Sequence, residues 1–273
     1  MNSVQLRPKE RSKFRITLGK FVYTNKRRIE WFFDSKKYSR TIQEDLLSYT
    51  AFKHQTILMR QLQDVDMWYQ HNKVINLKIA IKKLSGITIQ PGETFSYWKL
   101  IGRPTKNKGY VDGMVLFYGT FTKGIGGGLC QLSNLIYWAT LHTPLTVTER
   151  HRHSFDVFPD SRRTQPFGSG ATCSYNYLDL QIKNETNEPY QLYLTVTDTH
   201  LVGEWRTTTP TLHTYHVYEK NHMISPAYWG GYLRHNTIFR KKYNRQKQLV
   251  ADEFITENHA IMMYEPLLEN TNN

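Results

Sequence analysis

A cysteine that directly follows a run of glycines is the feature of this sequence that points most clearly to chemistry. The stretch reads Gly124-Ile125-Gly126-Gly127-Gly128-Leu129-Cys130-Gln131-Leu132-Ser133 and leads into an apolar pattern of helical spacing. A helix N-terminus concentrates unpaired N–H groups and partial positive charge, which favour a thiolate or a bound anion. Cys130 is therefore a candidate nucleophile, with a buried packing role as the alternative. The candidate oxyanion or anion-binding donors are Gly126, Gly127, Gly128 and Gln131.

Two histidines follow the expected helix, in the run Glu149-Arg150-His151-Arg152-His153-Ser154-Phe155-Asp156. A thiol nucleophile needs a base and a group that orients it. If this run continues the strand before it, His151 and His153 point to one face, and either is a candidate base. Asp156 or Asp179 is the candidate orienting carboxylate.

The same run supports three other interpretations. The histidine pair with a carboxylate has the residue types of a metal site. The guanidinium groups of Arg150 and Arg152 suit a carboxylate or phosphate ligand. The third interpretation is a solvated strand end of mixed charge that has no functional role.

The pattern along the chain predicts an α+β fold, with N-terminal helices followed by a mostly antiparallel β region. One central helix begins at Cys130 and ends near His142, before Pro144. Earlier helices are expected over residues 39–71 and 72–85, where Gly86 fits a helix stop. The expected strands cover residues 87–89, 111–121 as a hairpin, 145–149 with a polar continuation over 150–154, 178–183 paired with 190–198, 212–219, 232–240 and 249–255.

The charge is strongly positive and concentrated at the N-terminus. The chain of 273 residues has a net charge of +13, and residues 1–40 contain 12 Lys or Arg against 3 Asp or Glu. Such an arm binds phosphates or lies on an anionic membrane surface, unless it is a solvated tail. Nucleic acid is not favoured as the partner, because no zinc finger or RNA-binding motif accompanies the charge.

Several function classes lack their sequence signals. The chain has no secretory apolar region and no run of roughly 18 apolar residues, so we expect a cytoplasmic protein, with peripheral attachment to the inner membrane face through the arm. Its two cysteines, Cys130 and Cys173, are expected to be free thiols. Phosphate-loop, dinucleotide-binding and HExxH motifs are absent, and we predict no cofactor and no metal.

Five segments together resemble the VanW family. They are Pro91-Gly92-Glu93-Thr94-Phe95-Ser96, Gly109-Tyr110, Gly124 to Ser133, Glu149 to Ser154, and Asp179-Leu180-Gln181-Ile182-Lys183-Asn184. The resemblance is firm over about residues 72–206. It implies an accessory protein of glycopeptide resistance in a cell-wall context, and it implies no particular reaction. The expected division is a basic arm (1–38), a helical segment (39–90), a VanW-like α+β core (91–210) and a β-rich C-terminal extension (211–273).

Two classes of function follow from the residues and the resemblance. The first is a cysteine-dependent acyl-transfer or amide-cleaving enzyme that acts on peptidoglycan-type peptides, with Cys130 as nucleophile and His151 or His153 as base. The second is a non-catalytic module that binds an anionic cell-wall precursor through the glycine loop, Arg150 and Arg152. A peripheral scaffold on an anionic membrane surface is a third hypothesis.

Overall fold

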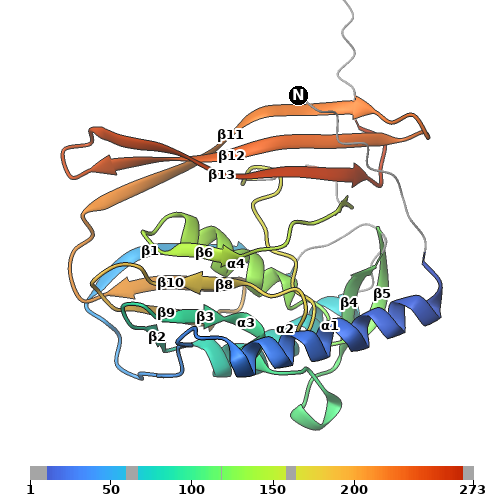
Figure 1. Ribbon diagram of the computed structural model, residues 1–273, viewed down its shortest axis with the longest axis horizontal. Helices are drawn as coiled ribbons and strands as arrows, with labels where there is room; N and C mark the ends of the chain where they lie inside the picture. Colours follow the sequence, from blue (N-terminus) through green and yellow to red (C-terminus); the bar gives the residue numbers. More distant parts are fainter. Residues whose placement is uncertain (1–10, 60–66, 118, 158–163, 267–273) are drawn as a thin grey trace, which may run out of the picture.

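The structure, a computed structural model, describes residues 11–59, 67–117, 119–157 and 164–266, and it confirms the predicted α+β class. Figure 1 shows the arrangement of its helices and strands. The helices are α1 (Lys13–Phe33), α2 (Met67–Leu84), α3 (Tyr97–Ile101), the short 3-10 helix η1 (Lys106–Lys108) and α4 (Cys130–Leu141). The strands are β1 (Tyr49–Ile57), β2 (Ile87–Ile89), β3 (Thr94–Ser96), β4 (Asp112–Phe117), β5 (Thr120–Ile125), β6 (Thr146–Glu149), β7 (Phe155–Asp156), β8 (Gln181–Lys183), β9 (Tyr190–Val196), β10 (His200–Thr207), β11 (His213–Pro226), β12 (Tyr232–Asn244) and β13 (Leu249–Met262).

The main hydrophobic core lies between two helices and an antiparallel sheet of order β1-β10-β9-β2. Helix α4 packs on β10 and β1, and α2 packs on β9. Trp205 of β10 is fully buried, and its indole N–H donates to Thr140 Oγ1 of α4 at 3.1 Å. Gly203 leaves room for Leu135 of α4, because a Cβ there would lie 3.0 Å from Leu135 Cδ2. This close packing fixes α4, and with it Cys130 at its first position.

A small sheet of order β3-β8-β6 holds the polar residues that matter for the site. Strand β8 is central and runs antiparallel to both neighbours. Ser96 ends β3 and caps α3, where its Oγ accepts from Lys99 N at 3.3 Å. Because Glu149 ends β6 and Asp179 lies two residues before β8, their side chains come to one end of this sheet.

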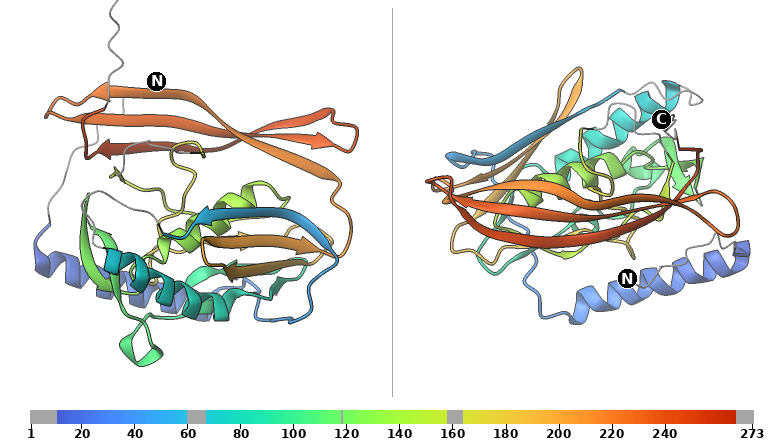
Figure 2. Two further views of the ribbon diagram at one scale, coloured as in Figure 1. Left: turned by 180° about the vertical axis from the view of Figure 1, so that it is seen from behind. Right: turned by 90° about the horizontal axis from the view of Figure 1, so that it is seen from above.

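The C-terminal strands form a separate layer over the core. Strands β11, β12 and β13 are long and antiparallel, and β7 joins β13 in parallel. Figures 1 and 2 show this layer beside α4, with the segment between β6 and β7 rising toward it. The backbone N–H of Ile261 donates to Ser154 O at 3.0 Å, which joins the two layers.

The first helix lies against the body with no buried residue. Ser12 caps it, since its Oγ accepts from Arg15 N at 3.4 Å. It contacts the body through Arg27, through a ring contact between Tyr23 and Tyr177 at 6.2 Å, and near Trp31. The basic arm is thus helical over much of its length, while residues 1–10 lie outside the described residues. Among the described residues, no helix combines the length and the apolar character needed to cross a bilayer.

The predicted helix over residues 39–71 is wrong, because residues 49–57 are strand β1. This segment pairs with β10 along its whole length, and Lys53 Nζ lies 2.9 Å from Glu204 Oε1 across the ladder. The pairing outweighs the near-helical spacing of Leu46, Leu47, Phe52 and Leu58. The expected second helix is confirmed as α2, and Gly86 follows it with a φ of +87°.

Two other strand predictions are wrong. Strands β8 and β9 do not pair with each other: β8 joins β3 and β6, whereas β9 joins β2 and β10. Residues 150–154 do not continue β6 as a strand. The hairpin β4–β5, the central helix α4 and strands over β6, β11, β12 and β13 confirm the corresponding predictions, although the last three strands are longer than expected.

Candidate functional site

The glycine loop before α4 is shaped by close packing. A Cβ on Gly127 would lie 2.2 Å from the carbonyl carbon of Gly113 in β4, and Gly128, with a φ of +91°, faces the side chain of Lys73. Asn76 of α2 donates to Gly127 O at 2.9 Å and to Val111 O at 3.0 Å. Glycine is required here because two backbones and a helix approach each other without room for side chains.

The N–H groups expected to hold an anion already have acceptors. Their bonds are Gly126 N to Val111 O at 3.0 Å, Gly127 N to Gly124 O at 3.1 Å, Gly128 N to Met114 O at 3.0 Å, and Gln131 N to Gly128 O at 3.1 Å. The side chain of Gln131 donates to Thr56 Oγ1 and Ile57 O of β1. The loop therefore offers little to an oxyanion through these donors.

The thiol of Cys130 lies in a desolvated environment, although the residue keeps some accessible surface. Its Sγ donates to the backbone carbonyl of Cys173 at 4.0 Å. Burial raises the pKa of the Cys130 thiol above its ordinary value of 9.0, against the smaller opposing effect of backbone hydrogen bonds. Within the described ranges, neither His151 nor His153 is a hydrogen-bond partner of this sulfur. The thiolate expected from the helix N-terminus is thus disfavoured at neutral pH.

The two histidines turn to different partners. His151 Nε2 lies 2.9 Å from Glu149 Oε1. His153 lies beside α4, with Nδ1 2.8 Å from Thr172 Oγ1 and Nε2 3.5 Å from Asn134 Oδ1. Because residues 150–153 are not a strand, their i, i+2 spacing does not place both rings on one face.

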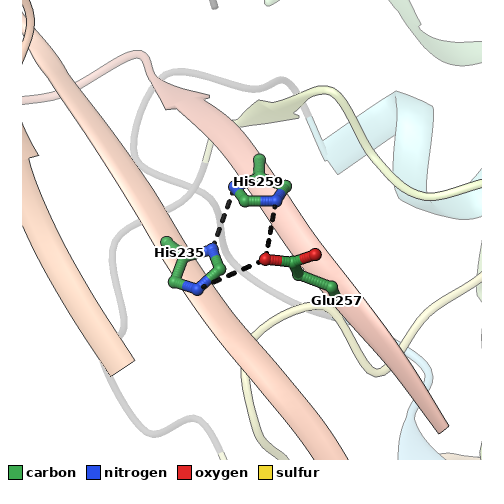
Figure 3. Close-up of side chains that lie close together, drawn as sticks. All are labelled: His235, Glu257 and His259. Carbon is green, nitrogen blue, oxygen red and sulfur yellow. Dashed lines mark hydrogen bonds and ion pairs between the residues drawn. The ribbon is translucent and has the colours of Figure 1, made fainter. Parts of the chain in front are cut away.

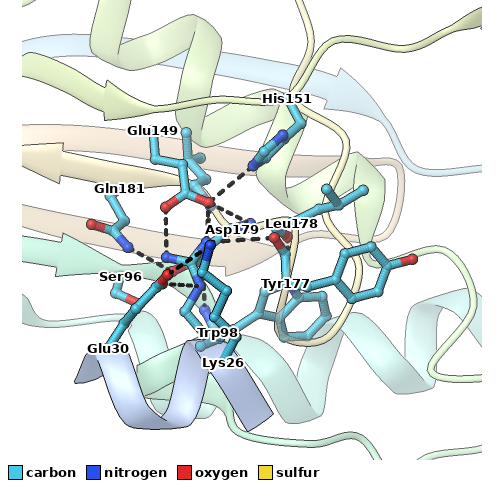
Figure 4. A network of polar contacts seen from close by, with 12 residues as sticks. Lys26, Glu30, Ser96, Trp98, Glu149, His151, Tyr177, Leu178, Asp179 and Gln181 are labelled. Carbon is cyan, nitrogen blue, oxygen red and sulfur yellow. Dashed lines mark hydrogen bonds and ion pairs between the residues drawn. The ribbon is translucent and has the colours of Figure 1, made fainter. Parts of the chain in front are cut away.

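Glu149 is the centre of a polar network at the end of the small sheet (Figure 4). Arg27 of α1 donates to both of its carboxylate oxygens, at 2.7 Å and 2.5 Å, and Asp179 N donates to it at 3.2 Å. Burial alone would raise the pKa of Glu149. The hydrogen bonds from His151 and Arg27, together with the charge of Arg27, instead lower that pKa to about 2. Glu149 is therefore an anion held by a cation from outside the sheet.

Asp179 lies deeper in the same network, fully buried. Its carboxylate accepts from Ser96 Oγ at 2.6 Å, from Trp98 N at 2.9 Å and from its own neighbour, Leu180 N, at 2.9 Å. Burial raises its pKa to about 6, although the bonds from Ser96 and Trp98 act in the opposite direction. The structure thus places Asp179 as a buried anchor of α3, and the carboxylate that contacts His151 is Glu149.

Asp156 is engaged by the C-terminal layer. Arg234 of β12 donates to its Oδ2 at 3.0 Å and Tyr264 Oη donates to the same oxygen at 2.9 Å. Asp156 and Arg234 are both buried, and the pair fastens β7 to the layer. None of the hydrogen bonds found for Asp156 within the described ranges reaches His151 or His153.

The two arginines beside the histidines differ in whether their guanidinium groups have hydrogen-bond acceptors. Arg150 bridges the layers: it donates to Gly168 O at 2.5 Å and Gly170 O at 2.9 Å, and to Thr256 and Asn258 of β13. Arg152 is partly buried, and it has no hydrogen-bond acceptor or ion-pair partner in the part of the chain that the structure describes. Its charge is close enough to oppose the protonation of both Arg150 and His259, adding to the effect of their burial on the pKa.

Sequence reasoning did not select Glu149, Arg27 or Ser96 as site residues. For Glu149 the sequence does contain a signal, because this carboxylate stands only two residues before His151. Arg27 has none, since 122 residues separate it from Glu149 and only the docking of α1 brings them together.

Comparison with known proteins places this site in a family. Residues 72–206 match the family model described as "VanW like protein". Residues 72–206 therefore form a VanW domain. The VanW region contains the glycine loop, Cys130, Glu149 and Asp179, whereas Arg27 and strands β11 to β13 lie outside it.

Two curated relatives extend this comparison. The chain is 41% identical over 172 residues to the vancomycin B-type resistance protein VanW of Enterococcus faecalis. This match covers 63% of this chain and 62% of that protein. It is 31% identical over 114 residues to the uncharacterised protein YoaR of Bacillus subtilis, covering 42% of this chain and 36% of that protein. The matches thus span less than two thirds of either relative. No solved structure shows a significant match to the chain.

Proposed function

We propose that the chain acts in glycopeptide resistance as a non-catalytic module that binds an anionic group of a cell-wall precursor. The cellular context comes from the relative in Enterococcus faecalis, whose name assigns it to vancomycin resistance. A peptidoglycan-type peptide with a free carboxylate is the precursor that we expect to bind.

The observation that carries this proposal is the unsatisfied charge of Arg152. A partly buried guanidinium normally finds a carboxylate or phosphate, because leaving it without an acceptor costs free energy. Arg152 has neither within the described residues, and it lies near a second arginine and a histidine. A guanidinium that lacks an internal anion and lies near a second guanidinium offers a site for an external anion.

The environment of Cys130 favours binding over cysteine catalysis. A nucleophilic cysteine needs a lowered pKa and a nearby base. Burial raises the pKa of Cys130, and its hydrogen bond goes to the Cys173 carbonyl. The thiol therefore lacks both supports within the described part of the chain.

Calorimetric titration with a synthetic muropeptide tests the proposal. The matched ligand is the same peptide with its C-terminal carboxylate converted to an amide, which removes the anion and little else. We expect the wild-type chain to bind the acid and not the amide. Arg152→Gln should weaken binding about tenfold or more, the loss expected for one charged hydrogen-bonded contact. Arg103→Gln, an exposed arginine, is the control and should bind like the wild type.

The same titration separates binding from catalysis. Cys130→Ala should bind the acid with unchanged affinity, and mass spectrometry of the peptide after incubation should show it intact. Equal binding of acid and amide would overturn the proposal. Cleavage or transfer that disappears in Cys130→Ala would establish the cysteine-dependent enzyme instead.

A second function is favoured by the outer face of α1. Apolar side chains lie along it at helical spacing, and four of its phenylalanines are between 67% and 81% exposed: Phe14, Phe21, Phe32 and Phe33. Basic residues accompany them, including Lys13, Arg15, Lys20, Lys26 and Arg28. An exposed apolar stripe with basic flanks suits an anionic bilayer surface. We therefore propose that α1 attaches the protein to such a surface.

Vesicle sedimentation tests this attachment. We expect binding to vesicles of phosphatidylcholine with phosphatidylglycerol, weaker binding to phosphatidylcholine alone, and a decrease with salt. The double variant Phe14→Ser, Phe21→Ser should lose most of the binding. Tyr228→Ser is the control, because Tyr228 is a 69% exposed aromatic residue far from α1 in the sequence. Binding that persists in the double variant would exclude the helix as the anchor.

A further inference from the structure

Three potential metal ligands meet on the C-terminal layer (Figure 3). His235 of β12 and His259 of β13 are directly opposite each other in the antiparallel ladder. Glu257 stands two residues before His259, so both side chains lie on the same face of β13. The three offer ligand atoms that all lie within 4.8 Å of one another, and they form the only such group found in the described part of the chain.

The distances between these groups match a small metal site. Glu257 Oε1 lies 3.2 Å from His259 Nε2 and 3.7 Å from His235 Nε2. Zinc–nitrogen and zinc–oxygen bonds near 2.1 Å in a tetrahedral arrangement place the ligand atoms about 3.4 Å apart. The two distances to Glu257 lie on either side of that value, and all three ligand atoms lie within 4.8 Å of one another.

The three side chains also contact one another directly. The two rings approach each other, with His235 Nδ1 2.9 Å from His259 Nδ1, and each also approaches Glu257. The separation of 3.7 Å is too long for a hydrogen bond. The 2.9 Å and 3.2 Å contacts use the two N–H donors of two neutral imidazoles, which is the ring state that binds a metal ion.

The surroundings allow an ion to enter and to be held. The side chains of His235 and His259 are 13% and 15% exposed, whereas Glu257 is 49% exposed and marks the open side. The ladder continues on both sides of the pair, to Tyr232 and Met262 at its near end and much further in the other direction, and it holds the two rings at a fixed register. Neutral imidazole with carboxylate is the donor set that suits zinc and its neighbours in the first transition series.

We propose that His235, Glu257 and His259 bind one divalent transition-metal cation of the zinc type. Each ring provides one nitrogen and Glu257 provides carboxylate oxygen, which leaves a fourth position for water or an anionic ligand. Three protein ligands with an open position are typical of sites that also bind a ligand at the metal. The metal site does not depend on the muropeptide proposal, because its ligands are independent of Arg152.

Zinc titration of the full chain, without a polyhistidine tag and after treatment with a chelator, tests the site. Competition with a chromophoric chelator should give one zinc ion per chain. Cobalt(II) as a substitute should give the visible absorption of a four-coordinate ion. Bound zinc should also raise the melting temperature, because only the folded chain holds the three ligands together.

The decisive variant is Glu257→Gln, because Glu257 is half exposed and its replacement leaves the ladder intact. We expect about tenfold weaker zinc binding or more, with an unchanged melting temperature in the absence of metal. His259→Asn should lose binding further. His216→Asn is the control, since His216 is exposed on β11 outside the cluster. Wild-type affinity in both Glu257→Gln and His259→Asn would overturn the proposal, as would an equal loss in the control.

Discussion

At the scale of single residues, the two carboxylates of the small sheet lie in opposite electrostatic environments. Glu149 is paired with Arg27 and His151, which hold its pKa at about 2, whereas burial lifts the pKa of Asp179 to about 6. When the pKa values of two neighbouring carboxyl groups are shifted in opposite directions, one group stays an anion and the other can bind and release a proton. The pair therefore gives the folding stability of this protein a particular pH dependence.

Asp179→Asn should change the pH profile of stability on its near-neutral side. The folded-state pKa of Asp179 lies above its ordinary value of 3.8, so the folded state binds the extra proton between about pH 4 and 6. Stability attributable to this residue is complete below pH 4 and falls as the pH rises through 6. Urea unfolding across this range should show that fall in the wild type and a flatter profile in Asp179→Asn. An identical slope in both proteins would contradict the assignment.

Glu149→Gln should act on the acidic side. The folded-state pKa of Glu149 lies below its ordinary value of 4.5, so its stabilising contribution is present above pH 4.5 and is lost as the pH falls toward 2. Its side chain is 19% exposed, and we expect the variant to be about 2–3 kcal/mol less stable at pH 7. The difference from the wild type should shrink below pH 3. Glu185→Gln, an exposed carboxylate, is the matched control.

The thiols should react slowly. Burial raises the pKa of both Cys130 and Cys173, so little thiolate forms at neutral pH. Iodoacetamide labelling followed by peptide mass spectrometry should show both cysteines reacting well below the rate of a free thiol at pH 7.5, and the rate should rise when the chain is unfolded. Rapid labelling of Cys130 in the folded chain would restore the nucleophile hypothesis.

At the scale of elements, the glycine loop shows how a pattern typical of ligand binding can serve packing. The loop brings the start of α4 against β4 and α2, and its own N–H groups are used by the carbonyls of Val111 and Met114. Positive φ values at Gly126 and Gly128 make these turns, while Gly127 is required by contact. The loop therefore positions α4 and the residues that follow it.

Two glycine-to-alanine changes should act in opposite directions. In Gly127→Ala the new Cβ would meet the backbone of Gly113 at 2.2 Å, and neither backbone can move away independently. We expect a loss of about 2–3 kcal/mol or more in unfolding free energy. Gly19→Ala makes the same chemical change inside α1, where nothing lies within 4 Å. That variant should be more stable, or its helix less frayed, by up to about 1 kcal/mol. Chemical denaturation and circular dichroism measure both, and equal behaviour would contradict the packing argument.

At the scale of the whole molecule, a few buried or partly buried arginines join the C-terminal layer to the VanW region. Arg150 connects the segment 168–170 to β13, and Arg240 of β12 donates to Leu141 O and Thr143 O at the end of α4. Arg234 binds Asp156. These contacts fix the segment between β6 and β7, and therefore His153 and Arg152, between the two layers.

Arg150→Ala should loosen this junction. Its guanidinium donates four hydrogen bonds, and their loss leaves the carbonyls of Gly168 and Gly170 without that donor. Hydrogen exchange measured by mass spectrometry should increase in β13 and in residues 164–173, with little change in α2. The control is Arg103→Ala, because Arg103 is an exposed arginine of the VanW region, and this variant should leave exchange in both segments as in the wild type. Unchanged exchange in β13 after Arg150→Ala would show that other contacts hold the layer.

The sequence by itself determined the features that depend on neighbouring residues. Periodic apolar residues and terminal glycines predicted α2 and α4, turn residues predicted the hairpin β4–β5, and the motifs of residues 91–184 indicated the family. Local spacing determines these features because their hydrogen bonds and caps form within a few residues. The resemblance also gave the context of resistance, which spacing alone does not contain.

Only the tertiary structure decided which distant groups meet. Strand β1 forms because β10 offers it an edge to pair with. The carboxylate that contacts His151 is that of Glu149, at the end of β6, and not that of an aspartate. The cluster of His235, Glu257 and His259 depends on the register of two strands, since a shift of one residue would turn a ring to the opposite face. Such contacts are set by the free energy of the whole packed chain, and no short stretch of sequence specifies them.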